Sequence, residues 1–219
     1  METAPFGTRL IVRGPAWLRF DDVELSQENA WLRRKAEDPE HTGWYIERFR
    51  KLAAAGEDLA GEARLVDAMV PRRARILDAG SGTGRVGAAL HAAGHDVIGV
   101  DLDPELVLAA RKDHPGPSWL VGDLADLDIQ PAGFDAIVSA GNVMAFVAPA
   151  TRIKILENCK RHLKDGGRLI IGFGAGRGYA FEDFLDDARA AGLRQDVLLA
   201  TWDLRPFTPE SDFLVAILS

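Results

Sequence analysis

Residues 76–85 read ILDAGSGTGR, a short apolar run followed by glycines at positions 80, 82 and 84 and then by a helical pattern. Glycine permits positive φ and lets a ligand approach the backbone, and free N–H groups at a helix start can bind an anionic group. The dinucleotide fingerprint places its third glycine three residues after the second, where this chain has Arg85. The stretch therefore predicts a ligand-binding turn between a strand and a helix, with a purely structural tight turn as the alternative.

Beyond residue 74, short apolar runs alternate with helical patterns. The runs ARILDAG, DVIGVD, FDAIVSA and GRLIIGF do not alternate with polar residues, which is typical of parallel strands covered by helices on both faces. A weaker strand, PSWLVGD, lies between the second and fourth of the expected strands. The chain closes with VLLATW and FLVAIL, whose short connection suits an antiparallel pair. The sequence therefore predicts a doubly wound α/β fold with seven strands.

Before residue 74 the pattern is helical. The stretches SQENAWLRRKAE, TGWYIERFRKLAAA and DLAGEARLVDAMV each fit a helix, and in the last of them apolar residues recur at spacings of three and four. Ser26 and Thr42 have the side chains expected of residues that cap the start of the first two helices.

Composition narrows the classes of function. The 219 residues include 47% apolar residues and one cysteine, Cys159, so the chain fits one globular domain without a disulfide framework and favours a cytoplasmic location. The formal charge of −7 makes nucleic acid an unlikely partner, and we expect the basic clusters at 33–35 and 72–75 to be solvated surface. Arginines interrupt the N-terminal stretch, so we expect no signal peptide, and the longest uncharged run, 136–151, is too short to span a membrane.

Three aspartates stand at or near the ends of the expected strands. Asp101 ends the second strand, where a carboxylate can accept both hydroxyls of a ribose. Asp123 ends the third strand, where a short acidic side chain can meet the edge of an adenine, and Asp78 precedes the glycines, near a cationic group of the ligand. The spacing thus indicates a nucleotide-like cofactor without naming a reaction.

Five stretches in order, ILDAGSGTGR, VDLDPE, GDL, FDAIVSAGNVMAFV and LKDGGRLIIGF, resemble the successive motifs of the class I S-adenosylmethionine-dependent methyltransferases. The resemblance covers about residues 60–219. It implies a mostly parallel, Rossmann-like sheet in the order 3-2-1-4-5-7-6 with an antiparallel last strand. It also implies a helical N-terminal lid, for which we expect residues 1–60, in front of a methyltransferase core, residues 61–219.

The resemblance further implies a set of cofactor contacts around S-adenosylmethionine. The expected contacts are Asp78, Gly80, Ser81, Gly82, Thr83 and Gly84 at the methionine end, Asp101 at the ribose, Leu102, Asp123 and Leu124 at or near the adenine, and Ala140 as a further contact after the fourth strand. In the lid, Arg48 could pair with the cofactor carboxylate and Trp44, Tyr45 and Phe49 could wall the pocket. The alternative is that the aromatic residues only dock the helix and that Arg48 is solvated.

The catalytic residues are not evident from the sequence. Residues 139–143 read SAGNV and depart from the Asn/Asp-Pro-Pro-aromatic signature of enzymes that methylate amino groups of adenine, cytosine or glutamine. Asn142 could orient an acceptor, Arg177 could bind an acidic one and His41 could reach a substrate, although each is also an ordinary polar residue. No cluster has metal-ligand spacing, so we expect no metal.

We therefore expect methyl transfer from S-adenosylmethionine to a small-molecule acceptor. The alternatives are a non-catalytic S-adenosylmethionine-binding protein, an aminopropyl transferase, and an NAD(P)-dependent oxidoreductase, which the glycine spacing disfavours. The oligomeric state stays open.

Overall fold

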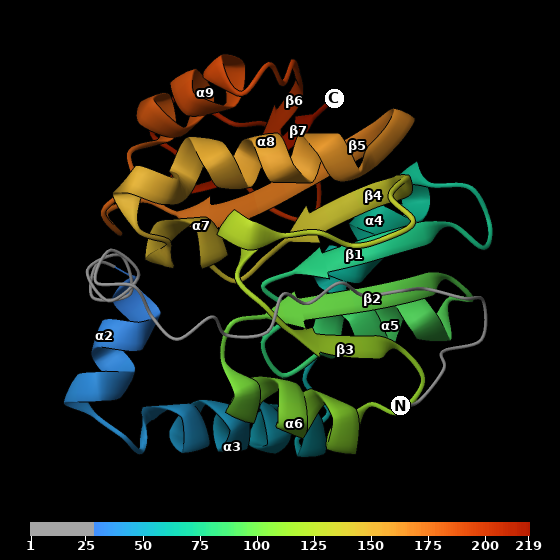
Figure 1. Cartoon of the computed structure of the whole chain (residues 1–219), viewed down its shortest axis with the longest axis vertical. Helices are drawn as coiled ribbons and strands as arrows, with labels where there is room; N and C mark the ends of the chain where they lie inside the picture. The colour runs from blue at the N-terminus through green and yellow to red at the C-terminus, as the bar shows by residue number, and fades with distance from the viewer. Residues whose placement is uncertain (1–28) are drawn as a thin grey trace.

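The computed structural model describes residues 29–219, and its centre is a seven-stranded sheet in the order β3-β2-β1-β4-β5-β7-β6 (Figure 1). All pairings among the first five strands of this order are parallel, and β7 runs antiparallel to both of its neighbours. This confirms the order and the antiparallel last strand. The strands are β1 (Arg75–Ala79), β2 (Asp96–Asp101), β3 (Ser118–Val121), β4 (Phe134–Ser139), β5 (Leu163–Gly174), β6 (Gln195–Leu199) and β7 (Phe213–Leu218).

Helices cover both faces of this sheet. On one face α4 and α5 pack against Ile76 and Val138, and on the other α8 and α9 pack against Leu77 and Ile137. Consecutive residues of one strand are thus buried on opposite faces, which is why the strand sequences are apolar without alternation. The helices of this part are α4 (Gly61–Met69), α5 (Arg85–Ala92), α6 (Pro104–Asp113), α7 (Val143–Phe146), α8 (Arg152–His162) and α9 (Phe181–Ala190), with short 3-10 turns η1 (Leu124–Asp126) and η2 (Pro149–Thr151).

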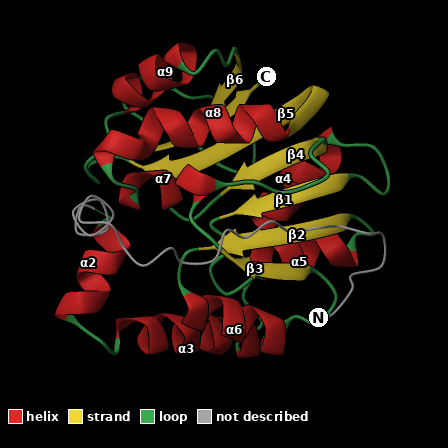
Figure 2. Cartoon of the chain, in the orientation of Figure 1, coloured by secondary structure: helices red, strands yellow, loops and turns green. Residues whose placement is uncertain are grey.

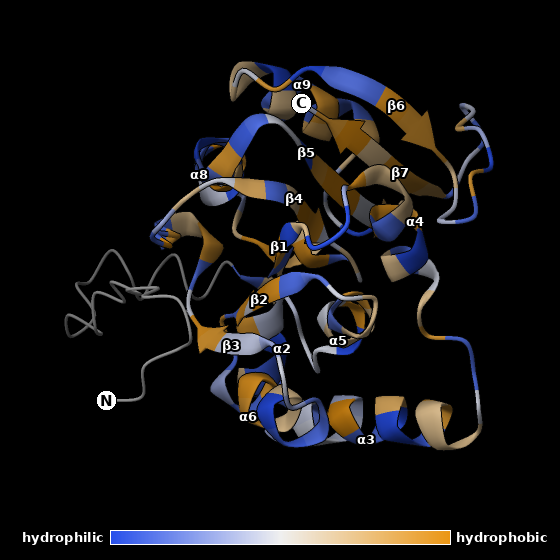
Figure 3. Cartoon of the chain, turned by 90° about the vertical axis from the view of Figure 1, so that its right-hand side faces the viewer, coloured by the Kyte–Doolittle hydropathy of each residue, from blue (hydrophilic) through white to orange (hydrophobic). Residues whose placement is uncertain are grey.

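Two further helices, α2 (Ala30–Glu37) and α3 (His41–Ala54), stand away from the sheet. Helix α3 packs on α6, and α2 contacts both α3 and α7. In Figure 2 the arrowheads of β1 to β4 point toward the side of the molecule where α2 and α7 lie. Figure 3 shows the apolar colour concentrated on the strands, whereas α3 carries apolar and polar positions side by side. The helix pair therefore borders the end of the sheet at which the ligand loops lie.

The two expected caps have different outcomes. Ser26 lies outside the described residues, and Asn29 caps α2, because its Oδ1 accepts from the N–H groups of Trp31 and Leu32 at 3.0 and 3.2 Å. The prediction for Thr42 is wrong, since α3 begins at His41 and the hydroxyl of Thr42 donates instead to the carboxylate of Asp103 at 2.8 Å. The acceptor lies 61 residues further along the chain, beyond the reach of any local pattern.

No helix in residues 29–219 has the length and apolar character needed to cross a membrane.

Trp119 of β3 fills the space beside three glycines and so fixes the turn after β1 from below. A Cβ added at Gly99 would lie 2.3 Å from the Trp119 ring, and one added at Gly87 or Gly84 would lie 2.8 or 2.9 Å from it. The indole N–H donates to the carbonyl of His114 at 2.9 Å, which anchors the ring at the end of α6. Each of these positions therefore needs a residue without a side chain.

We predict that Gly99→Ala destabilises the protein by about 1–3 kcal/mol, because the added methyl group must displace the Trp119 ring. The matched control is Gly43→Ala in α3, where an added Cβ meets nothing within 4 Å. We expect the control to stabilise the helix by about 0.5–1 kcal/mol. Thermal unfolding of both variants measures the difference, and a Gly99→Ala protein as stable as the parent chain would contradict this packing.

Candidate functional site

The described residues form a pocket at the carboxyl ends of β1, β2, β3 and β4, beneath α2 and α3. It encloses about 850 Å³ of space free of atoms, including part of its open mouth. Its floor comes from the loops that follow four strands, and its roof from the two N-terminal helices. The lining consists of Asn29, Trp31, Tyr45, Asp78, Gly80, Ser81, Gly82, Thr83, Arg85, Val86, Asp101, Leu102, Leu106, Gly122, Asp123, Leu124, Ala140, Gly141, Val143, Phe146 and Val147.

The turn after β1 has the backbone that its glycines allow. Gly80, Gly82 and Gly84 all adopt positive φ, at 80°, 54° and 85°. A Cβ on Gly80 would lie 2.4 Å from a methyl carbon of Val143, so the turn sits directly against the start of α7. Ser81 lines the pocket, and its hydroxyl is buried without a hydrogen-bond partner within residues 29–219. The turn thus holds one unsatisfied polar group next to the pocket.

Asp101 links this turn to the loop after β2. Its Oδ2 accepts from the N–H of Gly82 at 2.8 Å, and its Oδ1 accepts from the N–H of Asp103 at 2.9 Å. Burial raises the pKa of Asp101 to about 6, although these backbone donors oppose the shift. A carboxylate oxygen accepts more than one hydrogen bond, so both oxygens keep acceptor capacity toward the pocket.

Asp78 is 2% exposed and lies under the same turn. Its Oδ2 accepts from the N–H of Gly87 at 2.9 Å. Burial raises the pKa of Asp78 to about 7, while that hydrogen bond and the positive charge of Arg85 pull it down. A cationic ligand group near this carboxylate would favour its ionised form.

Asp123 stands at the open side of the pocket, next to the apolar side chain of Leu124. The Asp123 carboxylate is exposed and accepts from the N–H of Ala125 at 2.8 Å, which caps η1. Leu102 lies across the pocket on the loop after β2, and Ala140 lines it from the end of β4. The structure therefore brings together ten of the twelve residues expected to contact a cofactor, all but Gly84 and Arg48.

Comparison with known proteins assigns the fold to a family. The model of a methyltransferase domain matches residues 76–167. A solved structure of a TehB-like SAM-dependent methyltransferase from Corynebacterium glutamicum is 52% identical, with a TM-score of 0.80, over 83% of this chain and 99% of that one. The chain belongs to the class I S-adenosylmethionine-dependent methyltransferases.

Two curated relatives match a shorter part of this methyltransferase. The biotin biosynthesis bifunctional protein BioHC of Cellvibrio japonicus is 34% identical over 56% of this chain and 26% of its own length. A demethylmenaquinone methyltransferase of Thermotoga maritima is 30% identical over 56% of this chain and 54% of its own length. The matches thus span about a quarter and about half of these relatives.

The pocket of this methyltransferase fits S-adenosylmethionine, the cofactor of its family. The cofactor carries a ribose with two hydroxyl donors, an ammonium group and an adenine amino group, all of which need acceptors. The pocket offers the carboxylates of Asp78 and Asp101, at or near the ends of β1 and β2, and that of Asp123, just after β3. The donor-rich ligand and the acceptor-rich pocket are complementary.

Two residues from the helices around the turn line the pocket: Tyr45, which was expected there as a lid aromatic, and Arg85, which was not expected. Tyr45 of α3 has its hydroxyl and ring edge 3.8 Å from the place that a Cβ on Gly82 would take. Burial raises the pKa of this hydroxyl. Arg85 donates to Glu62 at 2.7 Å and to the carbonyl of Leu59 at 3.0 Å, which ties α5 to α4. Tyr45 was expected only as a lid aromatic, and nothing in the local sequence indicates where Arg85 points.

Four candidate residues of α3, His41, Trp44, Arg48 and Phe49, do not line the pocket. Arg48 is exposed, with its guanidinium 5.9 Å from the Trp44 ring and 5.5 Å from the Phe49 ring, and it does not line the pocket. His41 stacks on Trp44 at 5.5 Å and is likewise absent from the lining. Arg85 is the cation that lines this end of the pocket, and Arg48 as a partner of the cofactor carboxylate stays a prediction.

Asn142 and Arg177 lie together at the ends of β4 and β5. Asn142 adopts a φ of 70°, and its Oδ1 accepts from the N–H of Gly174 at 2.8 Å. A Cβ on Gly174 would lie 3.3 Å from Nε of Arg177 and 3.5 Å from Oδ1 of Asn142. Asn142 therefore joins the two strand ends, and Arg177 is exposed beside it. Within residues 29–219 no three His, Cys, Asp or Glu side chains are grouped so as to hold a metal ion.

We predict that Asp78→Asn stabilises the cofactor-free protein at pH 8. The pKa of Asp78 is about 7 in the folded protein and 3.8 in the reference state. Folding therefore takes up a proton between these two pH values, and the free energy of unfolding falls as pH rises through this range. Neutralising the side chain removes this loss, a gain of about 2 kcal/mol, or about 4–8 °C in Tm. The charges facing it are those of Arg85, Asp101 and Glu62.

Thermal unfolding between pH 5 and pH 8 measures this effect, with the exposed Asp165→Asn as control. The variant should show a flatter dependence of Tm on pH than the parent chain. An unchanged pH dependence together with a lower Tm would show that the Asp78 carboxylate is not destabilised by its burial.

Proposed function

We propose that this protein transfers the methyl group of S-adenosylmethionine to a small-molecule acceptor. The observation that carries the proposal is the pocket in which Asp78, Asp101 and Asp123 surround the glycine turn. Family membership supports the chemistry, because the model of a methyltransferase domain matches the segment that forms this turn and these loops.

The roles we assign to the cofactor residues follow from their places in the pocket. Asp101, fixed by two backbone N–H groups, accepts the ribose hydroxyls. Asp78 receives the amino-acid end, beside Gly80, Ser81, Gly82 and Thr83 of the turn. Asp123 accepts from the adenine amino group. Leu102 and Leu124 cover the adenine ring, and Ala140 adds a contact from the end of β4.

The contribution of the chain to the reaction is mainly alignment. When bound, S-adenosylmethionine supplies a methyl group already activated by its positive sulfur. The pocket residues then hold the cofactor so that the acceptor atom lies in line with that bond, and such orientation can contribute about 7–11 kcal/mol. A general base adds about 10²–10⁴-fold only where the attacking atom must lose a proton. We therefore assign no catalytic base.

The N-terminal helices act as the lid in this proposal. We take residues 1–60 as the lid segment and 61–219 as the core; residues 1–28 of this segment lie outside the described residues. Trp31 of α2 and Tyr45 of α3 line the pocket from above, and Tyr45 lies over Gly82. A roof of aromatic side chains excludes water from the charged groups beneath it, which strengthens their interactions with the cofactor.

A small molecule is the acceptor that fits this arrangement. The acidic chain offers no general attraction for nucleic acid. Similar proteins include demethylmenaquinone methyltransferases and a ubiquinone biosynthesis O-methyltransferase, which supports a small acceptor here. Asn142 has its amide N–H₂ left to orient an acceptor, and Arg177, which forms no ion pair within residues 29–219, is placed to meet an acidic one. His41 can meet an acceptor only at the outer edge of the lid.

Mass spectrometry of a metabolite extract tests the proposal. The purified chain is incubated with the extract and methyl-labelled S-adenosylmethionine, and products that gain the label are identified. We expect at least one labelled product together with S-adenosylhomocysteine. Binding of S-adenosylmethionine without transfer to any acceptor would support the non-catalytic alternative. If neither S-adenosylmethionine nor S-adenosylhomocysteine binds at millimolar concentration, the proposal is refuted.

We predict that Asp101→Asn weakens S-adenosylhomocysteine binding by about tenfold or more, because a charged acceptor of two ribose hydroxyls is lost. Calorimetry measures the dissociation constant, and Asp96→Asn, an exposed position at the start of the same strand, is the control. A dissociation constant equal to that of the parent chain would remove Asp101 from the ribose site.

A further inference from the structure

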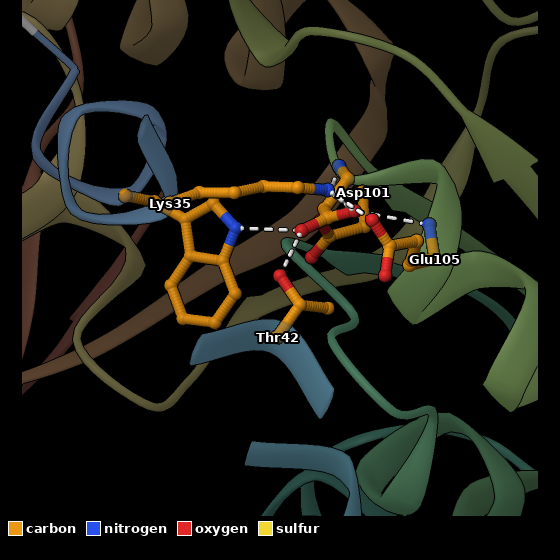
Figure 4. Close-up of polar contacts among 6 residues, drawn as sticks. Lys35, Thr42, Asp101 and Glu105 are labelled. Carbon is orange, nitrogen blue, oxygen red and sulfur yellow. Dashed lines mark hydrogen bonds and ion pairs between the residues drawn. The ribbon is translucent and has the colours of Figure 1, made fainter. Parts of the chain in front are cut away.

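Asp103 is a fully buried carboxylate at the junction of the lid helices and the loop after β2. Its Oδ2 accepts from the indole N–H of Trp31 at 2.9 Å and from the hydroxyl of Thr42 at 2.8 Å. Its Oδ1 accepts from the ammonium of Lys35 and from the N–H of Glu105, both at 2.9 Å. Figure 4 shows Lys35 and Thr42 converging on this point from one side, with Asp101 and Glu105 on the other.

Three of these four donors belong to the lid. Trp31 and Lys35 are on α2 and Thr42 is on α3, whereas only the N–H of Glu105 comes from α6 itself. Hydrogen bonds to an ionised carboxylate are stronger than those between neutral groups. Undocking of the lid would therefore take three partners from one carboxylate at once, so this group favours the docked lid.

The same residue also holds the carboxylate that we place at the ribose. The N–H of Asp103 donates to Oδ1 of Asp101 at 2.9 Å, while Gly82 donates to Oδ2 at 2.8 Å. Asp103 and Asp101 are separated by one residue, so a shift of the Asp103 backbone displaces the acceptor of Asp101. Trp31 is a second connection between Asp103 and the pocket, because its indole N–H donates to Asp103 and the residue also lines the pocket.

We propose that Asp103 is a positioning residue that couples docking of the lid to binding of the ribose, so that the pocket roof and the ribose acceptor form in one cooperative step. The inference rests on the proposed role of Asp101. Asp103 does not line the pocket and acts through Asp101, Trp31 and the lid helices. Cofactor binding thus stabilises the docked lid, and the docked lid stabilises the bound cofactor, as thermodynamic linkage requires.

Asp103→Asn in the full chain is the first test. Asparagine caps helices well and keeps the bond to Glu105, so α6 is preserved, but it loses the charge that meets Lys35 and half of the acceptor capacity. We expect the dissociation constant of S-adenosylhomocysteine to rise by about tenfold. In the parent chain the ligand should slow amide hydrogen exchange over residues 30–54, and in the variant this protection should largely disappear.

Thr42→Val is the second test and covers the case in which Asp103→Asn does not fold. The two side chains have nearly the same shape, Thr42 does not line the pocket, and only the hydrogen bond to Asp103 is lost. We expect a smaller weakening of S-adenosylhomocysteine binding, by about threefold to tenfold, with reduced protection of the lid.

Asp113→Asn is the matched control. It breaks the ion pair with Arg50 at 2.8 Å, which also joins α3 to α6 but makes no contact with Asp101. We expect an unchanged dissociation constant for S-adenosylhomocysteine, and the ligand should slow amide hydrogen exchange over residues 30–54 as much as it does in the parent chain.

The outcomes separate this inference from the proposed function. If the parent chain binds no S-adenosylhomocysteine, the proposed function fails. If the parent chain binds it and Asp101→Asn weakens binding, but Asp103→Asn and Thr42→Val bind within about twofold of the parent, then only the coupling is overturned. A purely structural role of Asp103 would lower Tm and leave both the dissociation constant and the ligand-dependent protection unchanged.

Discussion

The carboxylate of Asp101 is the constraint on which the rest of the site depends. It receives one backbone N–H from the turn after β1, at Gly82, and one from the loop after β2, at Asp103. A single half-buried carboxylate thereby links two loops that follow different strands. The turn carries the glycines over which a ligand can lie, and the loop carries Asp103, which binds the lid helices. The positions of the pocket floor and of its roof therefore both depend on Asp101.

Packing from below gives the same turn its rigidity before any ligand arrives. The Trp119 ring occupies the volume that side chains at Gly84, Gly87 and Gly99 would need. Glycine usually brings conformational freedom, and here the neighbouring ring removes that freedom by contact. A turn that is already fixed loses little entropy when it binds, which is the general advantage of a preorganised site. The glycines therefore let the Trp119 ring pack against the backbone from one side and leave room for a ligand on the other.

The sequence was sufficient for features that repeat or that lie at strand ends. Apolar runs without alternation indicated a covered parallel sheet, and the carboxyl ends of its strands indicated where Asp78, Asp101 and Asp123 meet. The order of the strands came from the resemblance. Contacts between distant segments could not be predicted from the sequence, because helical periodicity shows which face of a helix is apolar but not which group that face contacts. Thr42 looked like a cap for this reason, although its hydroxyl serves a carboxylate 61 residues away.

The buried Asp78 and Asp103 and the half-buried Asp101 differ in how many donors the protein itself gives them, and this difference separates structural from ligand-binding roles. Asp103 receives four donors, and although burial opposes its ionisation, the bonds from Lys35, Trp31 and Thr42 lower its pKa. Asp78 receives one N–H from Gly87, and its pKa is raised to about 7. Asp101 lies between them, with backbone donors only and a pKa of about 6. A buried acid that the fold leaves short of donors is stabilised by a ligand that brings them, whereas one that the fold satisfies has nothing to gain from a ligand. Because Asp78 and Asp101 have few hydrogen-bond donors from the protein, we assign them to the donor-rich cofactor. Asp103 has four such donors, three of them from the lid, and we assign it to holding the lid.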